Sequence, residues 1–245
     1  MSQWNQNPLD RQFGGFAPTS ESIPGSPAIV AFFNAVYGWM AAGLGVTALT
    51  AWLVSHNLDA MRTVLSGPML IGLFIAQIAL VVVISSAIQR INANVATILF
   101  LLYSALTGLT LSGIFLVYAT ATITGAFLVT AVTFGAMSAF GMVTHRDLSG
   151  IGHFLYMALI GIIIASVVNM FFASSGMYWL ITYAGVLIFV GLTAYDTQRL
   201  KVLAAQSAGD GALAARYSVV GALMLYLDFI NLFLLLLRLL GDRRR

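Results

Sequence analysis

The stretch that decides the fold is Leu223–Leu240, which reads LMLYLDFINLFLLLLRLL and carries two charged residues, Asp228 and Arg238. A helix that crosses a bilayer needs about 20 mostly apolar residues. The largely apolar run reaches back to Leu213, which supplies that length. We therefore predict that Leu213–Leu240 is a membrane-spanning helix.

The composition extends this conclusion to the whole chain of 245 residues, a length that fits one compact domain. Hydrophobic residues make up 60% of it and charged residues 8%, whereas a soluble domain carries about 25% charged residues. The net charge of +3 comes from dispersed basic residues, which argues against a nucleic-acid partner. The chain has no cysteine, which excludes disulfides, thiolate metal sites and cysteine nucleophiles.

Seven windows are long and apolar enough to span a bilayer, so we predict an all-α, polytopic membrane protein. The apolar runs are continuous, without the alternation of a β-barrel wall, and short linkers favour antiparallel neighbours. The seven predicted spans are Ala28–Ser55, Pro68–Ile88, Ala93–Tyr118, Thr120–Val143, Ile151–Ala173, Met177–Leu200 and Leu213–Leu240.

The membrane domain, residues 28–240, is flanked by two polar segments. Residues 1–27 are rich in Pro, Gly and Ser and lack the features of a signal peptide, so we expect a disordered leader. Lys and Arg in short loops place the N-terminus in the cytoplasm. The predicted inner segments contain Arg11, Arg90, Arg146, Arg199, Lys201 and Arg216, and the outer loops contain Arg62. The basic tail, 241–245, conflicts with this rule if all seven segments cross; a re-entrant seventh segment is the alternative.

Small residues form stripes on several spans. They are Gly38, Ala41, Ala42 and Gly45 in the first span, Gly108 and Ser112 in the third, and Gly135 and Ala139 in the fourth. Membrane helices associate where small side chains let backbones approach. These stripes therefore predict helix-packing seams.

Two aspartates stand inside predicted spans, where a charge costs at least about 2.5 kcal/mol. Asp228 lies about 20 Å into its helix, and Asn231 shares its face. Asp196 lies about 15 Å from the end of the sixth helix if that helix continues to Gln206. The helices are joined by a short linker, so we expect both acids at similar depth.

Two close carboxylates in a low dielectric share a proton and titrate in separate steps. Their oxygens also suit a hard cation such as Ca²⁺. The pair therefore indicates a pH-sensing gate with a transient Ca²⁺ site, without a permanently bound cofactor. The alternative is that each aspartate pairs with an arginine, such as Arg199 beside Asp196, or caps a backbone break. Arg90 is either a partner of the acids or a snorkelling anchor.

Other polar side chains give weaker signals. His145 and His153 do not match a metal-ligand spacing. The amides of Gln77, Asn92, Asn94 and Asn169 either line a pore or form bonds between helices.

Three motifs resemble the Bax inhibitor-1 family. Gly191–Leu200, GLTAYDTQRL, resembles its sixth helix; Ala222–Leu234, ALMLYLDFINLFL, resembles its seventh; and Leu106–Ser112, LTGLTLS, resembles its third-helix signature. The similarity covers residues 28 to 240.

This resemblance implies a seven-helix fold with the last helix central, and a pH-sensitive Ca²⁺ leak. It also implies a gating pair, here Asp196 and Asp228, and an arginine of the second helix that latches onto it, here Arg90. A bacterial relative modulates a membrane-bound ATP-dependent protease, which gives a second hypothesis, a regulatory binding protein. The short loops and the lack of eukaryotic targeting signals fit a bacterial inner-membrane member.

A third hypothesis, an intramembrane hydrolase using two aspartates, has less support. No Gly-x-Gly-Asp motif lies within a span, and Gly209-Asp210-Gly211 falls in a linker. We therefore predict that the protein is not an enzyme.

Overall fold

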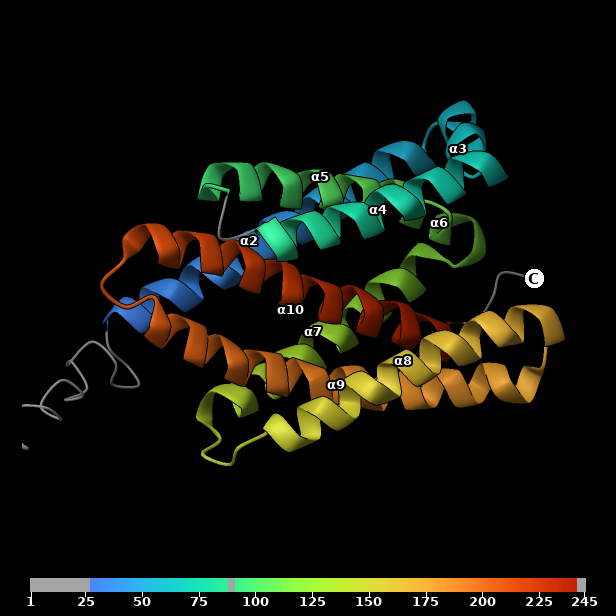
Figure 1. Cartoon of the computed structure of the whole chain (residues 1–245). Coiled ribbons are helices and arrows are strands. Elements are labelled where there is room, and N and C mark those ends of the chain that lie inside the picture. Colours follow the sequence, from blue (N-terminus) through green and yellow to red (C-terminus); the bar gives the residue numbers. More distant parts are fainter. Residues whose placement is uncertain (1–26, 88–90, 242–245) are drawn as a thin grey trace, which may run out of the picture.

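The computed structural model describes residues 27–87 and 91–241, and this part of the chain is built from helices without strands. Residues 1–26 of the predicted leader, the Arg90 position and residues 242–245 of the basic tail lie outside the described residues, whereas Pro27 begins α2. The helices, labelled in Figure 1, are α2 (Pro27–Ser55), α3 (Leu58–Val64), α4 (Gly67–Ala87), α5 (Ala93–Leu111), α6 (Ile114–Val117), α7 (Thr120–Val143), α8 (Ser149–Phe172), α9 (Ser175–Gln206) and α10 (Gly211–Leu240).

Seven of these segments, with α5 and α6 counted together, are long and apolar enough to cross a membrane, as predicted. The last of them, α10, is one uninterrupted helix from Gly211 to Leu240. At 1.5 Å per residue it is about 45 Å long, enough for a hydrocarbon core of about 30 Å. This continuity favours seven full spans over a re-entrant last segment.

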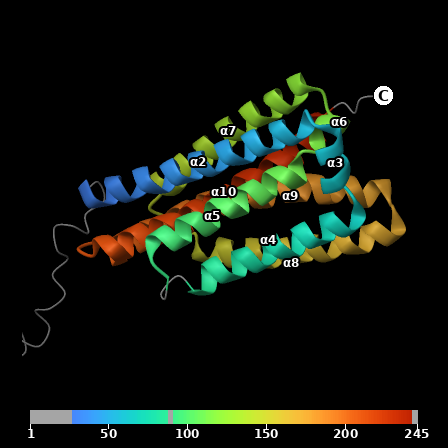
Figure 2. The ribbon, with the colours of Figure 1, turned by 90° about the horizontal axis from the view of Figure 1, so that it is seen from above.

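The centre of the bundle is α10. It packs against α9, α2, α7 and α5, and 67% of its most apolar window is buried, against 11% for α4 and 6% for α8. Figure 2 shows α10 running through the middle, with α4 and α8 along one side. The central position that the family resemblance implied is therefore confirmed.

Local side-chain chemistry sets several helix ends. Asn57 caps the short helix α3, which the sequence analysis did not predict, and Asp210 caps α10. Asn92 accepts a bond from the amide of Val95, and the Asn169 side chain accepts one from the amide of Ser174. Asn92 and Asn169 therefore bond to backbone amides at helix ends, and the hypothesis that they line a pore stays a prediction.

The third predicted span is interrupted between α5 and α6. The Ser112 hydroxyl donates to the carbonyl of Leu109, which competes with regular helix bonding. At Gly113, an added Cβ would lie 3.3 Å from Leu65 Cδ2. The chain thus turns at Gly113, where the absence of a side chain leaves room for Leu65 in the linker between α3 and α4.

Most of the predicted packing stripes were wrong. Gly38, Gly45 and Gly135 are exposed, and a Cβ added to any of them meets nothing within 4 Å. Gly108 does pack closely, because its added Cβ would lie 2.6 Å from the carbonyl oxygen of Thr47. The reason for the errors is that these helices carry small residues on lipid-facing sides as well, so size alone does not identify the buried face.

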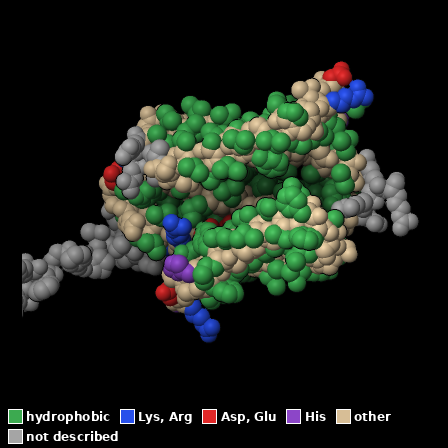
Figure 3. Space-filling model, turned by 45° about the vertical axis from the view of Figure 1, so that its right-hand side comes forward, with side chains coloured by type: hydrophobic (Ala, Val, Ile, Leu, Met, Phe, Trp, Pro, Cys, Tyr) green, Lys and Arg blue, Asp and Glu red, His purple; other side chains and the backbone are tan. Residues whose placement is uncertain are grey.

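The surface matches a lipid environment. Figure 3 shows hydrophobic side chains over most of the visible face, with charged and histidine side chains toward its ends. Many large exposed side chains of α8 are apolar, for example Ile160, Val167 and Phe171. Lipid tails take the place of water around such side chains.

Candidate functional site

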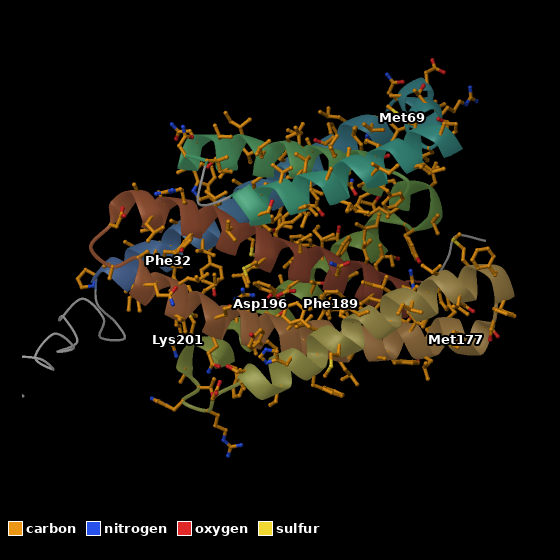
Figure 4. The ribbon with its side chains drawn as sticks, in the orientation of Figure 1. Phe32, Met69, Met177, Phe189, Asp196 and Lys201 are labelled. Carbon is orange, nitrogen blue, oxygen red and sulfur yellow. The ribbon has the colours of Figure 1, made fainter. Side chains whose placement is uncertain are left out.

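The two predicted acids lie in the interior of the bundle on neighbouring antiparallel helices. Asp196 on α9 is 3% exposed and Asp228 on α10 is 4% exposed. In Figure 4, Asp196 lies between Lys201, toward one end of the bundle, and Met177, toward the other. Asp196 therefore lies farther inside the bundle than Lys201 does.

The side chains converge although their helical positions differ. Asp196 lies about 15 Å from the end of α9, and Asp228 about 25 Å from the start of α10, at 1.5 Å per residue. Each Cα–Cβ bond tilts toward the N-terminus of its own helix. Because the helices are antiparallel, the Asp196 side chain leans deeper and the Asp228 side chain leans back toward it.

Both acids line one cavity of about 440 Å³ between α8, α9 and α10. Its polar lining consists of Asp196, Asp228, Tyr156, Ser166, Asn231 and Arg238, and the remaining walls are apolar. We refer to it as the acid cavity. The structure thus brings together the two carboxylates and Asn231, as the sequence analysis expected.

Tyr156 of α8 is the hydrogen-bonding partner of Asp196. Its hydroxyl donates to Oδ1 at 3.0 Å and lies 3.2 Å from Oδ2. Arg199 is exposed and forms no ion pair with Asp196, although its positive charge acts on that carboxylate. The alternative in which Asp196 is simply paired with Arg199 is therefore wrong.

Asp228 has the less satisfied carboxylate. Its Oδ2 is buried and has no hydrogen-bond partner among the described residues, and the charge of Asp196 acts on it. A buried polar atom without a partner is costly, and such an atom in a native protein calls for an explanation, such as a bound water, a bound ion or a functional role. Asn231 does not satisfy it, because its amide donates to the carbonyl of Leu227 at 2.8 Å.

Arg238 lies toward the other end of the acid cavity, near the end of α10. Its guanidinium carbon is 4.8 Å from the centroid of the Tyr178 ring, a cation–π contact between α10 and the start of α9. It places a positive charge in the same cavity as the acids. The predicted latch Arg90 lies outside the described residues.

Behind Asp196, a chain of hydroxyls holds α9 in place. Thr197 contacts Ser138 of α7 at 3.0 Å, and Ser138 is hydrogen-bonded to Tyr37 of α2. Gly141 of α7 reinforces this contact, because its added Cβ would lie 2.3 Å from the carbonyl oxygen of Ala194. The segment that carries Asp196 is thus fixed from the side opposite the cavity.

Sequence reasoning missed Tyr156 and Arg238. Tyr156 is a lone tyrosine in an apolar stretch of α8, and only the packing of α8 on α9 shows that it reaches Asp196. Arg238 could have been predicted to share a face of the helix with Asp228, because it stands about three turns after it. Among the amides named from the sequence, Gln77 donates to Thr110 at 2.6 Å and so joins α4 to α5.

The acid cavity can receive a cation but does not form a complete resident metal site. No group of three or more potential metal ligands occurs within the described ranges. The two carboxylates offer four oxygens at most, whereas Ca²⁺ takes 6–8. Water would have to complete the shell, which suits an ion in passage better than one held tightly.

A seven-span helical bundle with a buried carboxylate pair beside its central helix defines the class: a polytopic membrane protein with an ionisable intramembrane site. The family model described as "Inhibitor of apoptosis-promoting Bax1" matches residues 30–245. The chain belongs to the Bax inhibitor-1 family, as its helix motifs predicted.

Several curated bacterial proteins are similar to the chain. The chain is 53% identical to inner membrane protein YbhL of Escherichia coli K12 over 230 residues, which cover 93% of this chain and 98% of the relative. It is 48% identical to an uncharacterized protein of Borreliella burgdorferi, with 87% and 92% covered. It is 40% identical to an uncharacterized membrane protein of Streptococcus pyogenes, with 86% and 92% covered.

Proposed function

We propose that this protein is a pH-sensitive cation leak, with Ca²⁺ as the transported ion, and that Asp196 and Asp228 form its gating pair. The observation that carries the proposal is the buried Asp228 oxygen without a partner, in a cavity shared with a second carboxylate. A carboxylate in this position is costly to keep for structure alone. A proton or a cation provides the missing interaction.

The gating argument follows from charge. When both carboxylates are ionised, they repel each other in a poorly solvated cavity and attract a cation. When one is protonated, the repulsion and most of the attraction are removed. The pH thus sets the charge of the cavity, and with it the occupancy of the path.

The location and orientation are part of the proposal. YbhL is an inner membrane protein by name, which supports the same membrane here. The distribution of Lys and Arg supports an orientation with the start of α2 on the cytoplasmic side. The end of the bundle where α9 ends and α10 begins is then the inner end.

A flux assay tests this function. Purified protein in liposomes that contain a Ca²⁺ indicator is expected to release or admit Ca²⁺ at a rate that changes with pH. Asp228→Asn and Asp196→Asn are expected to flatten that pH dependence, because each fixes one side chain in a neutral state. Asp59→Asn is the matched control, since Asp59 is 95% exposed and lies in α3.

Two results would contradict the proposal. One is a protein that carries no cation at any pH under conditions where it remains folded. The other is a pH profile that both cavity variants share with the wild-type protein and with Asp59→Asn.

The modulation of a membrane-bound ATP-dependent protease stays a prediction, as does the absence of enzymatic activity. A pull-down against membrane proteases with and without residues 1–27 addresses the first. A peptidase assay on the same purified protein addresses the second.

A further inference from the structure

A second cavity, of about 430 Å³, lies at the end of the bundle where α2 begins, α9 ends and α10 begins. Small side chains line it, among them Ala204, Ser207, Ala214 and Ala215. We call it the end vestibule. It faces the membrane side from which the chain enters α2, and it does not include either acid.

Fully buried, closely packed side chains lie between residues of the end vestibule and residues of the acid cavity along α9 and α10. Leu200 is fully buried, and its Cδ2 lies 2.6 Å from the position that a Cβ on Gly221 would occupy. Val36 Cγ2 lies 3.3 Å from the same position, and Val36 is also fully buried. We call these three residues, from α9, α10 and α2, the Leu200 plug.

The helical spacing shows that the plug lies between the two cavities. Along α9, Asp196 lines the acid cavity and Ala204 lines the end vestibule, with Leu200 midway. The distance from Asp196 to Ala204 is about 12 Å along the helix. Along α10, Ser218 lines the end vestibule, Gly221 contacts Leu200, and Met224 lines the acid cavity.

We propose that the Leu200 plug is the inner gate of the ion path, and this inference rests on the proposed cation leak. A dry constriction of leucine and valine excludes a hydrated ion, and such constrictions open when their side chains move apart. Gly221 lets the Leu200 side chain lie against the backbone of α10, so a small shift between α9 and α10 changes the seal. The acids and the plug have different roles in this proposal. The acids attract the ion, and the Leu200 side chain blocks its passage.

A buried leucine is more often only part of a packed core, and Leu232 provides the comparison. Leu232 lies on the same helix as Gly221, is also fully buried, and lines neither cavity. Leu232→Ala therefore removes the same atoms from the core without joining two cavities. An effect specific to Leu200→Ala then reports the position of the side chain rather than the loss of packing.

Thiol labelling tests the plug independently of ion flux, because the chain has no cysteine to remove. Met224→Cys places a thiol in the acid cavity and Ala215→Cys places one in the end vestibule. A membrane-impermeant methanethiosulfonate reagent is added to inverted vesicles, which expose the inner end. The Ala215→Cys variant is expected to react, and the Met224→Cys variant to react slowly.

Adding Leu200→Ala to Met224→Cys is expected to raise the labelling rate from the inner side about tenfold or more, because the constriction is removed. Adding Leu232→Ala is expected to leave it unchanged. If Leu200→Ala does not fold, Leu200→Val is used, with a smaller increase expected. Equal labelling of Met224→Cys with and without the Leu200 substitution overturns the gate.

The flux assay separates this inference from the proposed function. If Leu200→Ala gives both faster labelling of Met224→Cys and a faster Ca²⁺ leak, the result supports the inner gate and the proposed cation leak. Faster labelling without any leak supports the plug as a barrier and contradicts the cation path that gives it its role. A pH-dependent leak with unchanged labelling leaves the leak in place and removes the plug.

Discussion

Replacing Gly141 with alanine tests how closely α7 must approach the helix that carries Asp196. The added Cβ would lie 2.3 Å from the carbonyl oxygen of Ala194 and 3.0 Å from both the Ala194 carbonyl carbon and Thr197 Cβ. The closest of these atoms belongs to the backbone and cannot rotate away. The two helices must therefore separate by about 1 Å to reach ordinary contact distances.

Overpacking of this kind costs about 1–3 kcal/mol. An open helical position gains about 0.5–1 kcal/mol when glycine becomes alanine. Gly135 is such a position on the same helix, since its added Cβ meets nothing within 4 Å. Both positions lie inside the same helix and share that gain, so the overpacking alone separates the variants, and we expect Gly141→Ala to be about 1–3 kcal/mol less stable than Gly135→Ala in the free energy of unfolding.

The assay is reversible unfolding in mixed micelles of increasing SDS content, followed by far-ultraviolet circular dichroism. Both variants keep the same composition, so the comparison isolates the contact with α9. Equal free energies of unfolding for the two variants would refute the close approach of α7 and α9 and the account of how Asp196 is held.

Three further predictions concern hydrogen bonds. Tyr156→Phe removes the hydroxyl that donates to Asp196. It is expected to lower the free energy of unfolding by about 1.5–3 kcal/mol in the same SDS assay, because hydrogen bonds to charged groups are stronger than those between neutral groups. An unchanged unfolding midpoint would contradict the bond. Gln198→Leu removes two bonds to the loop between α7 and α8, so faster hydrogen exchange is expected in that loop, and unchanged exchange would show that the side chain does not hold it. Hydrogen bonds from the side chain and amide of Ser149 hold the pKa of Asp147 below its usual range. The stabilisation is therefore present above the ordinary pKa and lost as pH falls through the lowered one. Ser149→Ala should move the pKa of Asp147 back upward in carbon-13 NMR, and a fixed value would refute this cause.

The spans could be predicted because hydropathy is a local property of the chain. Thr120–Val143 is observed at its predicted bounds, and α10 begins two residues before the prediction. The break near Ser112 was missed, because it arises from a side-chain bond and from the nearby α3–α4 linker rather than from a polar residue in the sequence. The short helix Leu58–Val64 was missed because it lies in a linker.

The packing faces could not be predicted from the same information. A membrane helix is apolar on its lipid side and its protein side, so Gly135 and Gly141 look alike in the sequence and differ only in what α9 places beside them. The burial of Asp196 and Asp228 was predictable, because a charge inside a span needs a protein interior. Their functional roles, and that of Arg90, stay predictions.

The position of α10 has a consequence for biosynthesis. The helix that fills the centre is the seventh to leave the ribosome, so the six earlier helices enter the membrane before their shared partner exists. Before α10 is present, the Thr47 hydroxyl can donate to the carbonyl of Ser104 but lacks the hydrogen bond that it shares with Tyr226 in the complete bundle. A chain terminated before Gly211 would keep the contacts of α2 with α5 and of α9 with α7 and α8, but would lack the helix on which α2, α5, α7 and α9 all pack.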